Sequence, residues 1–372
     1  MVKFEKKHKN PKIEQLMEQS NVISFKGQNI YIGIDVHLKS WSVTVLSENC
    51  HLKRLTQDPN PDVLYKYLIR MYPEAEYYSV YEAGFCGFWI HERLTELGIH
   101  NIVVNPADVP TKAGERLQKT DAVDSAKLAR SLRSKELKGI YIPCREALEM
   151  RSLIRLRSLI TKDMTRAKNR IKAHLRFFGY DIPQEFADRR WPKRFICWLR
   201  ALDMNTEEGK KALDIMLDAL EDLRKRMLDN TRALRRLSND KRLEGQMDLI
   251  TSVPGVGQVL GMTLLLEIGE FKRFKNAESL ASYIGLVPMC HNSGEHIGSG
   301  DITVRKHSSL RTMLVEAAWV AIRQDPAMTL AYENLYKRMK PSKAIIIIAR
   351  KMVNRIYHVM KYNEKYALNV VS

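Results

Sequence analysis

The stretch Tyr31-Ile-Gly-Ile-Asp-Val-His37 has the composition of a buried β-strand that contains one acidic residue, Asp35. We predict a strand over Ile30–Val36, followed by strands over Ser40–Leu46 and His51–Leu55, because alternating and β-branched residues dominate these segments. An isolated charge inside such a strand is costly, so Asp35 is expected to be paired or to bind a cation. These residues predict a β-sheet that carries a carboxylate on its first strand.

Alternating helical and strand patterns follow the three predicted strands. After Pro61, apolar residues recur at helical spacing as far as Met71. The remaining predicted elements are a strand at Tyr77–Tyr81, a helix at Phe88–Leu97, a strand at His100–Val104 and a helix at Asp121–Ser134. Three strands followed by alternating helices and strands are typical of a mixed α/β sheet. We therefore predict an α/β domain of the ribonuclease-H-like class over residues 29–145.

Three further acidic residues are predicted to lie near Asp35. Glu82 ends a predicted strand, and Asp121 and Asp124 stand three residues apart on one helix, so that both point the same way. Four carboxylates that converge at one end of a sheet suit two Mg²⁺ or Mn²⁺ ions, because hard cations prefer oxygen ligands. Such a pair of ions catalyses phosphoryl transfer. The alternative is a structural role for these acids. Asp35 would then be a structural residue at the end of a strand, and the acidic pair Asp121 and Asp124, near Lys127, would lie on a solvated helix face.

Residues 146–245 are predicted to form an elongated helical arm. Two apolar seams recur at spacings of three and four residues, as in a coiled coil. The first comprises Leu153, Leu156, Ile160, Met164, Ala167, Ile171 and Leu175, and the second Leu213, Met216, Leu220, Leu223, Met227, Asn230, Leu234 and Leu237. An antiparallel helical hairpin, interrupted at residues 179–206, or an oligomerisation arm would bury both seams. Asn230 could set the register or be a tolerated polar residue.

The net charge of the chain is +18, from 61 Lys and Arg against 43 Asp and Glu. This excess favours a nucleic acid, because basic side chains that neutralise phosphates release condensed counterions. An acidic small molecule would not need so much charge. The stretch Arg151–Arg176 in the first helix of the arm is the most biased segment, since Asp163 is the one acidic residue among its many cations. Its candidate nucleic-acid-binding residues are Arg155, Lys162, Arg166, Lys168, Arg170 and Lys172. The alternative is a solvated helix face.

Other features exclude several classes of protein. Five cysteines lie far apart without a Cys-x-x-Cys pair, so neither a zinc site nor a disulfide framework is expected, and a reducing cytoplasm fits. Residues 1–28 are polar and basic, which predicts an N-terminal arm rather than a signal peptide. The uncharged run Leu249–Leu266 contains Pro254 and three glycines, so we predict a buried hairpin and no membrane-spanning helix.

Residues 246–372 are predicted to form a mainly helical domain that begins with a helix–hairpin–helix. Pro254-Gly-Val-Gly257 lies between two apolar helical patterns, and Gly255 and Gly257 would let the backbone approach a phosphate. Such a contact does not read bases; the alternative is a plain tight turn. The other predicted elements are a helix at Ala277–Tyr283, a Gly-rich loop at Val287–Asp301, and helices at Leu310–Arg323, Ala327–Lys340 and Lys343–Tyr362.

The motifs IGIDVH, YEAG, NPADVP and KTDAVDSAKLAR, in this order, resemble the N-terminal domain of DEDD transposases of the insertion-sequence 110 family. The segments LASYIGLVP, HNSGE and LRTMLVEAAW resemble the C-terminal domain of the same family. The resemblance runs through almost the whole chain after residue 30. It implies a RuvC-like fold, similar to Holliday-junction resolvases, in which Asp35, Glu82, Asp121 and Asp124 form the metal-binding tetrad.

The resemblance also implies a serine nucleophile in the Ser-Gly position of the C-terminal domain, which is Ser293 here. A serine in a Gly-bearing loop is accessible, but its hydroxyl needs a nearby base or metal for activation. The alternative nucleophiles are Ser299, Ser308, Ser309 and Tyr283. The chain departs from the family pattern at Val304-Arg305-Lys306-His307, where relatives carry a basic residue and a glycine. Arg305 and Lys306 can still bind phosphate.

Together these features predict a three-part DNA transposase or recombinase of an insertion sequence, located in the cytoplasm. The resemblance implies two nucleic-acid partners, DNA and a structured non-coding bridge RNA. It also implies a homo-oligomer, a dimer or tetramer, in which the carboxylates of one subunit meet the serine of another. The main alternative is a structure-selective nuclease that uses the same carboxylates with water as nucleophile. A second alternative is a non-catalytic nucleic-acid-binding regulator in which the acids are structural.

Overall fold

The computed structural model describes residues 24–111, 120–186, 191–293 and 296–368, with the side chains of 290–301 outside that description. The chain divides into two compact units, Met1–Ile142 and Pro143–Ser372, and each unit is described by itself. Most of the predicted basic arm at 1–28 lies outside the described residues. No helix in the described part of the chain is long and apolar enough to cross a membrane.

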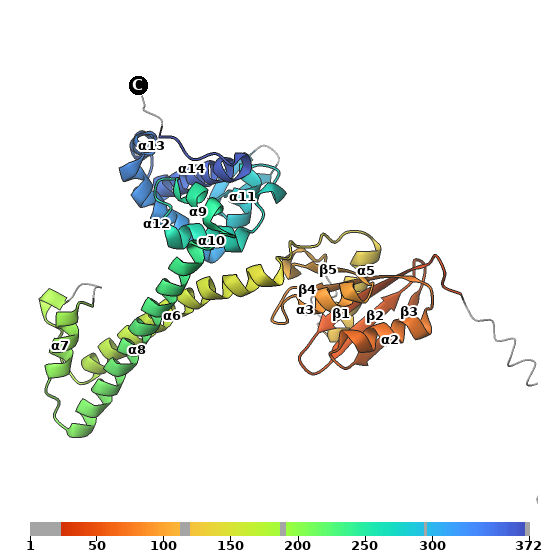
Figure 1. Cartoon of the computed structure of the whole chain (residues 1–372), viewed down its shortest axis with the longest axis horizontal. Helices are drawn as coiled ribbons and strands as arrows, with labels where there is room; N and C mark the ends of the chain where they lie inside the picture. The colour runs from red at the N-terminus through yellow and green to blue at the C-terminus, as the bar shows by residue number, and fades with distance from the viewer. Residues whose placement is uncertain (1–23, 112–119, 187–190, 294–295, 369–372) are drawn as a thin grey trace, which may run out of the picture. The chain divides into compact units, whose positions relative to one another are not determined.

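The N-terminal unit contains a five-stranded mixed sheet (Figure 1). Its strands are β1 (Asn29–Val36), β2 (Trp41–Leu46), β3 (His51–Gln57), β4 (Glu76–Glu82) and β5 (His100–Val104), in the order β3-β2-β1-β4-β5. The first three strands pair antiparallel, whereas β4 and β5 continue from β1 in parallel. The sequence-based prediction of a mixed α/β sheet is therefore confirmed.

One face of this sheet is covered by α2 (Pro61–Met71) and α3 (Trp89–Glu96). Side chains of a strand alternate between faces, and Ile30, Ile32 and Ile34 of β1 all point to this side, where they are fully buried. Pro at the start of α2 and a side-chain cap from the preceding asparagine begin that helix. These contacts form the core of the unit, so β1 is held from one side.

The opposite face of β1 is covered by α5 (Asp121–Arg133). Gly33 makes this possible, because a Cβ atom there would overlap the backbone of Ser125 and Ala129. Ser125 adds two buried side-chain hydrogen bonds to β2, at 2.9 Å to Thr44 Oγ1 and 3.3 Å to Ser42 Oγ. The first turn of α5 is therefore fixed close to β1.

The C-terminal unit begins with a helical hairpin. Here α6 (Arg145–Phe177) and α8 (Glu207–Ser238) lie side by side, with α7 (Lys193–Ala201) and η2 (Gln184–Phe186) between them in sequence (Figure 1). The predicted intramolecular seams are largely confirmed, since Ile160, Ala167, Ile171, Leu175, Leu213, Leu220 and Leu234 are all buried. Leu156 is an error of the prediction, because it is 46% exposed while Ile154 is buried. Asn230 is buried, and its Nδ2 donates to the Leu153 carbonyl at 3.1 Å, which ties α8 to α6.

The remaining elements form a mainly helical body. They are α9 (Glu244–Thr251), α10 (Gln258–Ile268), α11 (Ala277–Ile284), β6 (Pro288–Ser293), β7 (His296–Ile302), α12 (Ser308–Gln324), α13 (Pro326–Tyr336) and α14 (Pro341–Tyr362), with the 3₁₀ turn η3 (Phe271–Arg273). A further 3₁₀ turn, η1 (Pro106–Asp108), belongs to the N-terminal unit. The predicted Gly-rich loop at Val287–Asp301 is wrong, because β6 and β7 pair antiparallel there. The backbone pairing of β6 with β7 makes this segment a pair of strands, although the glycines of β7 favoured a loop.

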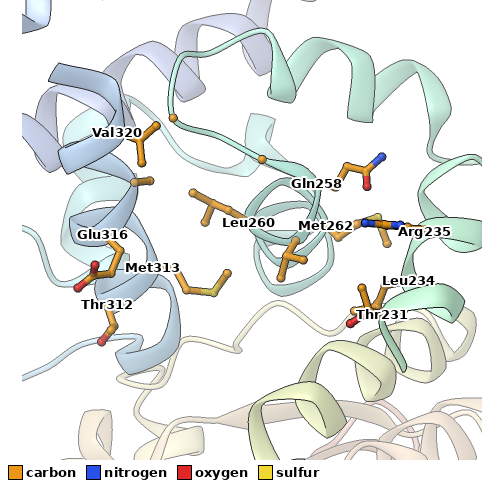
Figure 2. A pocket seen from close by; sticks show the side chains of 14 residues that line it. Thr231, Leu234, Arg235, Gln258, Leu260, Met262, Thr312, Met313, Glu316 and Val320 are labelled. Atoms are coloured by element: carbon orange, nitrogen blue, oxygen red, sulfur yellow. The ribbon is translucent and has the colours of Figure 1, made fainter. Parts of the chain in front are cut away.

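The turn between α9 and α10 uses Gly255 for packing. Its φ is +85°, and its N–H donates to Gln324 Oε1 at 3.0 Å. A Cβ there would collide with the Ala317 carbonyl oxygen of α12, at 2.5 Å. A groove of about 610 Å³ lies beside this turn, and Figure 2 shows that mainly apolar side chains line it. Gly255 therefore serves helix packing, and its predicted phosphate contact stays a prediction, whereas Gly257 is exposed at the start of α10.

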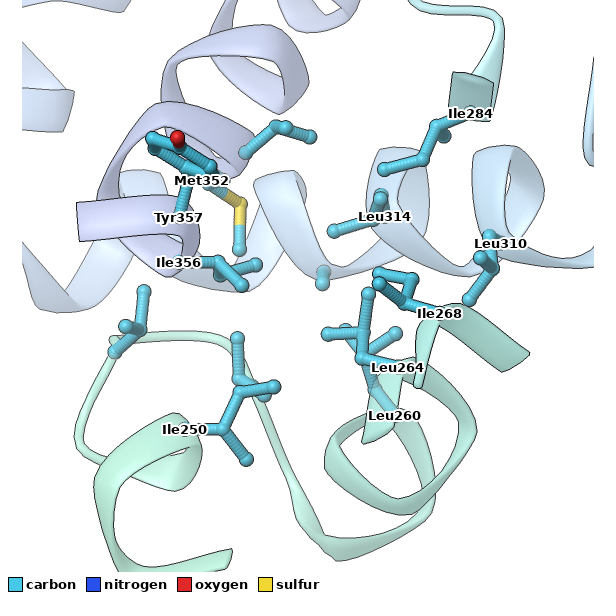
Figure 3. Close-up of a cluster of buried hydrophobic side chains, with 14 of the residues drawn as sticks. Ile250, Leu260, Leu264, Ile268, Ile284, Leu310, Leu314, Met352, Ile356 and Tyr357 are labelled. Carbon is cyan, nitrogen blue, oxygen red and sulfur yellow. The ribbon is translucent and has the colours of Figure 1, made fainter. Parts of the chain in front are cut away.

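The core of this body surrounds α10. Every residue of that helix from Leu260 to Ile268 is buried, including the charged Glu267. Figure 3 shows side chains of α9, α11, α12 and α14 meeting those of α10 in one cluster. This burial explains why the run Leu249–Leu266 carries no charge although it does not cross a membrane. A helix that is apolar all round is buried in the centre of a protein.

Candidate metal centre and nucleic-acid interface

Asp35 and Asp121 lie close together, with His37 between them. Asp35 is near the end of β1 on the face that α5 covers, and Asp121 is the first residue of α5. His37 Nε2 lies 3.2 Å from Asp35 Oδ2 and 3.5 Å from Asp121 Oδ1. Possible ligand atoms of the three side chains all lie within 4.8 Å of one another. One divalent cation could contact them together.

The electrostatics of Asp35 fit a cation. Burial raises the pKa of Asp35, contact with His37 lowers it, and the negative charges of Asp121 and Asp124 raise it again. The net direction is upward, so the surrounding protein leaves the negative charge of Asp35 incompletely compensated. A bound divalent cation would remove that penalty, and the carboxylates of Asp35 and Asp121 are oxygen donors of the kind that Mn²⁺ or Mg²⁺ prefers.

The other two predicted ligands, Glu82 and Asp124, meet at Lys127. Lys127 Nζ lies 3.1 Å from Asp124 Oδ1 and 3.6 Å from Glu82 Oε1. The lysine is only 8% exposed, and the Asp124 side chain is 22% exposed, whereas that of Asp121 is 67% exposed. Glu82 ends β4, the parallel neighbour of β1. The four acids therefore lie on the adjacent strands β1 and β4 and on the first turn of α5, and their role as a metal-binding tetrad stays a prediction.

Sequence analysis did not identify His37 and Lys127 as members of this site. A usable signal existed for His37, because residues two apart along a strand face the same side. Lys127 is one helical turn beyond Asp124, but its burial between two acids depends on β4, which is distant in sequence. Lys127 meets Glu82 only because α5 packs against the sheet.

Ser293 ends β6, where it pairs with His296 of β7. It therefore lies in a hairpin rather than in the predicted open loop, and its side chain lies outside the described residues. Among the alternative nucleophiles, Ser299 lies on β7 and Ser308 and Ser309 begin α12. The Tyr283 hydroxyl donates to the Glu267 carbonyl at 3.4 Å. The role of Ser293 stays a prediction.

The predicted cations of α6 differ in their surroundings. Lys162 and Arg170 are exposed, Lys168 and Lys172 are partly buried, and Arg166 pairs with Asp163 at 3.1 Å. Burial lowers the pKa of Lys168, and repulsion from Arg224 and Lys172 lowers it further. Positive charge is therefore concentrated here without equal compensation, a condition that favours a polyanion. Arg305 and Lys306, also predicted to bind phosphate, are both exposed near the start of α12.

Arg155 departs from the prediction for α6. Its guanidinium forms two hydrogen bonds with the carboxylate of Glu267, Nε to Oε1 at 2.8 Å and Nη2 to Oε2 at 2.9 Å. Arg151 Nε also lies 3.5 Å from that carboxylate. Because Glu267 is buried and needs a counter-charge, Arg155 stabilises the junction between α6 and α10, and its contact with a nucleic acid stays a prediction.

Two segments of the chain match models of known families. Residues 32–179 match a transposase model for the DEDD domain of IS110 elements. Residues 247–333 match the model described as "Transposase IS116/IS110/IS902 family". The chain belongs to the IS110 family of transposases. The first match contains Asp35, Glu82, Asp121 and Asp124, and the second contains Ser293, α10 and α9 from Met247 onward.

Relatives of this IS110-family transposase carry matching names. A protein of Sinorhizobium fredii, named as transposase y4qE, is 28% identical over 75% of this chain and 66% of its own length, just under two thirds. The transposase of insertion sequence IS1533 from Leptospira borgpetersenii is 24% identical over 78% of this chain and 85% of its own. The pilin gene-inverting protein of Moraxella bovis is 30% identical over 33% of this chain and 39% of its own. These names all describe proteins that move or invert DNA segments.

Proposed function

We propose that this IS110-family transposase cuts and rejoins DNA through Ser293, with Asp35, Glu82, Asp121 and Asp124 holding Mg²⁺ or Mn²⁺, two ions in the complete site. The observation that supports this most is the close approach of Asp35, His37 and Asp121, with ligand atoms within 4.8 Å. The uncompensated charge on Asp35 adds to that support. Bound cations would stabilise the negative charge that develops on a phosphate during its transfer.

The proposed reaction conserves the phosphodiester bond. The Ser293 hydroxyl loses its proton and attacks a phosphorus of DNA, which forms a Ser–O–P bond and breaks the P–O bond to one strand end. That strand end leaves as a hydroxyl. A hydroxyl of the strand that is to be joined then attacks the same phosphorus, which breaks the bond to serine. The bond energy is retained, so rejoining needs no further energy source.

The same proposal includes a RuvC-like fold, a helix–hairpin–helix, a structured RNA partner and a homo-oligomer. The mixed sheet with carboxylates on β1 and β4 supports a RuvC-like fold, and the α9–α10 hairpin supports a helix–hairpin–helix whose exposed Gly257 approaches a phosphate. The basic face of α6 supports a structured RNA as a second nucleic acid. A homo-oligomer would supply the serine of one subunit to the carboxylates of another.

The test compares Ser293→Ala and Asp35→Asn with the unmodified protein. We expect Ser293→Ala to bind Mn²⁺ normally, as measured by electron paramagnetic resonance, but to form no covalent adduct with DNA on denaturing gels. We expect Asp35→Asn to lose Mn²⁺ affinity at least tenfold and to lose cleavage. Ser308→Ala is a matched control, because it removes an exposed serine that is one of the alternative nucleophiles and should leave adduct formation intact if Ser293 is the nucleophile.

The same experiment separates the two alternatives. If Ser293→Ala still cuts DNA without an adduct, the nucleophile is water and the protein is a structure-selective nuclease. If neither the unmodified protein nor any variant cuts, and Asp35→Asn leaves Mn²⁺ binding unchanged, the acids are structural and the nucleic-acid-binding regulator is the better description.

A further inference from the structure

Three aromatic side chains lie in a row on α12 and α13. The ring centroids of Trp319 and Tyr332 are 5.7 Å apart and near perpendicular, and those of Tyr332 and Tyr336 are 6.0 Å apart and nearly parallel. Tyr336 is 55% exposed and Trp319 is 37% exposed. Large rings left this open lose much of the stabilisation that burial would provide. We define this row as the aromatic ladder.

Basic residues follow the aromatic ladder directly. The segment from Tyr336 onward reads Tyr-Lys-Arg-Met-Lys-Pro-Ser-Lys, and the chain has no acidic residue between Glu333 and Glu364. The four cations of this segment are all exposed, and in the part of the chain that the structure describes none of them forms an ion pair. They are Lys337, Arg338, Lys340 and Lys343. Uncompensated positive charge therefore lies beside open ring faces.

A groove of about 400 Å³ lies next to the aromatic ladder. Trp319 forms part of its wall, together with apolar residues of α12 and of the first turns of α14, among them Val315, Ile345 and Ile346. Arg311 and Glu316 are its charged members. A planar, uncharged group of the size of a nucleobase fits such walls better than a phosphate does, because the lining is largely apolar.

We propose that the aromatic ladder and its four following cations bind a single-stranded nucleic acid, with bases stacked on the rings and phosphates at the lysine and arginine side chains. Exposed aromatic rings beside a basic track are the features that bind unpaired strands, because every base has a face that can stack. A duplex keeps its base faces covered and would contact only the cations. The proposal rests on the proposed function in one respect, that the partner is a nucleic acid.

The test measures fluorescence anisotropy of labelled oligo-dT, oligo-U and a mixed-sequence duplex with the full chain. We expect Tyr336→Ala to weaken single-strand binding about tenfold, which corresponds to the loss of one stacked base, and to leave duplex binding unchanged. Tyr336→Phe keeps the ring and should bind like the unmodified protein. Tyr362→Ala is the matched control, because Tyr362 is 56% exposed but lies at the far end of α14.

A second variant tests the cations. Lys337→Gln combined with Arg338→Gln should flatten the dependence of single-strand affinity on salt, by roughly 0.7 in logarithmic slope for each phosphate that the protein no longer neutralises. A circular-dichroism melt of each variant shows that it is folded. A preference for oligo-U supports an RNA strand as the occupant, and a preference for oligo-dT supports a DNA strand.

Two results would overturn the proposal. One is a Tyr336→Ala variant that binds both oligonucleotides as tightly as the unmodified protein does. The other is an equal loss on single strands and duplex, which would reduce the surface to a general basic patch. Neither result depends on Ser293, since Ser293→Ala should bind the same oligonucleotides normally even if that serine proves not to be the nucleophile.

Discussion

Glu267 is the buried charge on which the junction between α6 and α10 depends. Its carboxylate contacts Arg155, Arg151 and His307, the last at 3.4 Å from Nε2. Burial raises the pKa of Glu267, but hydrogen bonds from Arg155 and His307 outweigh that effect and lower the pKa to about 2. His307 also caps α12, because its Nδ1 accepts from the Leu310 N–H. One carboxylate thus joins three helices.

This lowered pKa predicts how stability depends on pH. A carboxyl whose pKa is depressed by folding stabilises the protein above its unfolded value of 4.5, and this contribution is lost as the pH falls toward about 2. We expect Glu267→Gln to cost about 3 kcal/mol at pH 7 and progressively less below pH 4.5, as measured by urea unfolding. Glu278→Gln, at an exposed ion pair with Arg350, should cost under about 1 kcal/mol. Equal costs at pH 7 and pH 3 would contradict this account.

The position of α5 on the sheet decides whether the acidic residues can act together. Asp121 and Asp124 belong to its first turn, whereas Asp35 and Glu82 are on strands. The helix reaches β1 only because Gly33 has no side chain. The metal centre is therefore a property of two packed elements rather than of any one motif.

We expect Gly33→Ala to push α5 away from β1. The added methyl group would meet backbone atoms, which cannot rotate away, so the cost should reach about 3 kcal/mol, the upper end for overpacked sites. Mn²⁺ affinity should fall together with stability, measured by paramagnetic resonance and thermal melting. Gly84→Ala is the control within the same unit, since its Cβ would have no neighbour closer than 4.0 Å. A stable Gly33→Ala variant with normal Mn²⁺ binding would disprove the role of this contact.

Charge is the feature that concerns the whole molecule. The net charge is +18, but internal acids neutralise part of the basic residues, as Glu267 does for Arg155. The pKa of Lys168 is lowered mainly by burial and further by repulsion from Arg224 and Lys172, so uncompensated cations remain close together there. Affinity for nucleic acid should therefore depend on particular clusters rather than on the total charge.

Neutralising Arg166, Arg170 and Lys172 together should weaken binding of structured RNA or duplex DNA and reduce its dependence on salt. Each duplex phosphate that the protein no longer neutralises lowers the logarithmic slope by about 0.9, so removing all three cations would lower it by roughly 3. Filter binding at salt concentrations between about 50 and 200 mM measures this slope, because affinity changes strongly over that range. Lys225→Gln and Arg226→Gln on α8 provide a comparison at other basic positions. An unchanged slope would assign the three residues to a solvated helix face.

Local sequence determined most of the secondary structure and placed the four predicted ligands on their elements. Strand alternation around Asp35, the i,i+3 spacing of Asp121 and Asp124, and the two seams of the arm are all encoded by neighbouring residues. Periodicity reports burial along one element, which is why these predictions are confirmed. The β6–β7 hairpin is an exception, because its order comes from pairing between two segments that show no clear period, one of which carries two glycines.

Tertiary structure decided which partners each charged residue has. The pairing of Lys127 with Glu82 joins residues 45 positions apart in the chain, and that of Arg155 with Glu267 joins residues 112 positions apart. Gly255 likewise packs against α12, where a Cβ would meet the Ala317 carbonyl. No local pattern contains these pairings, because the free energy of a charge or of a missing Cβ depends on what the fold places beside it.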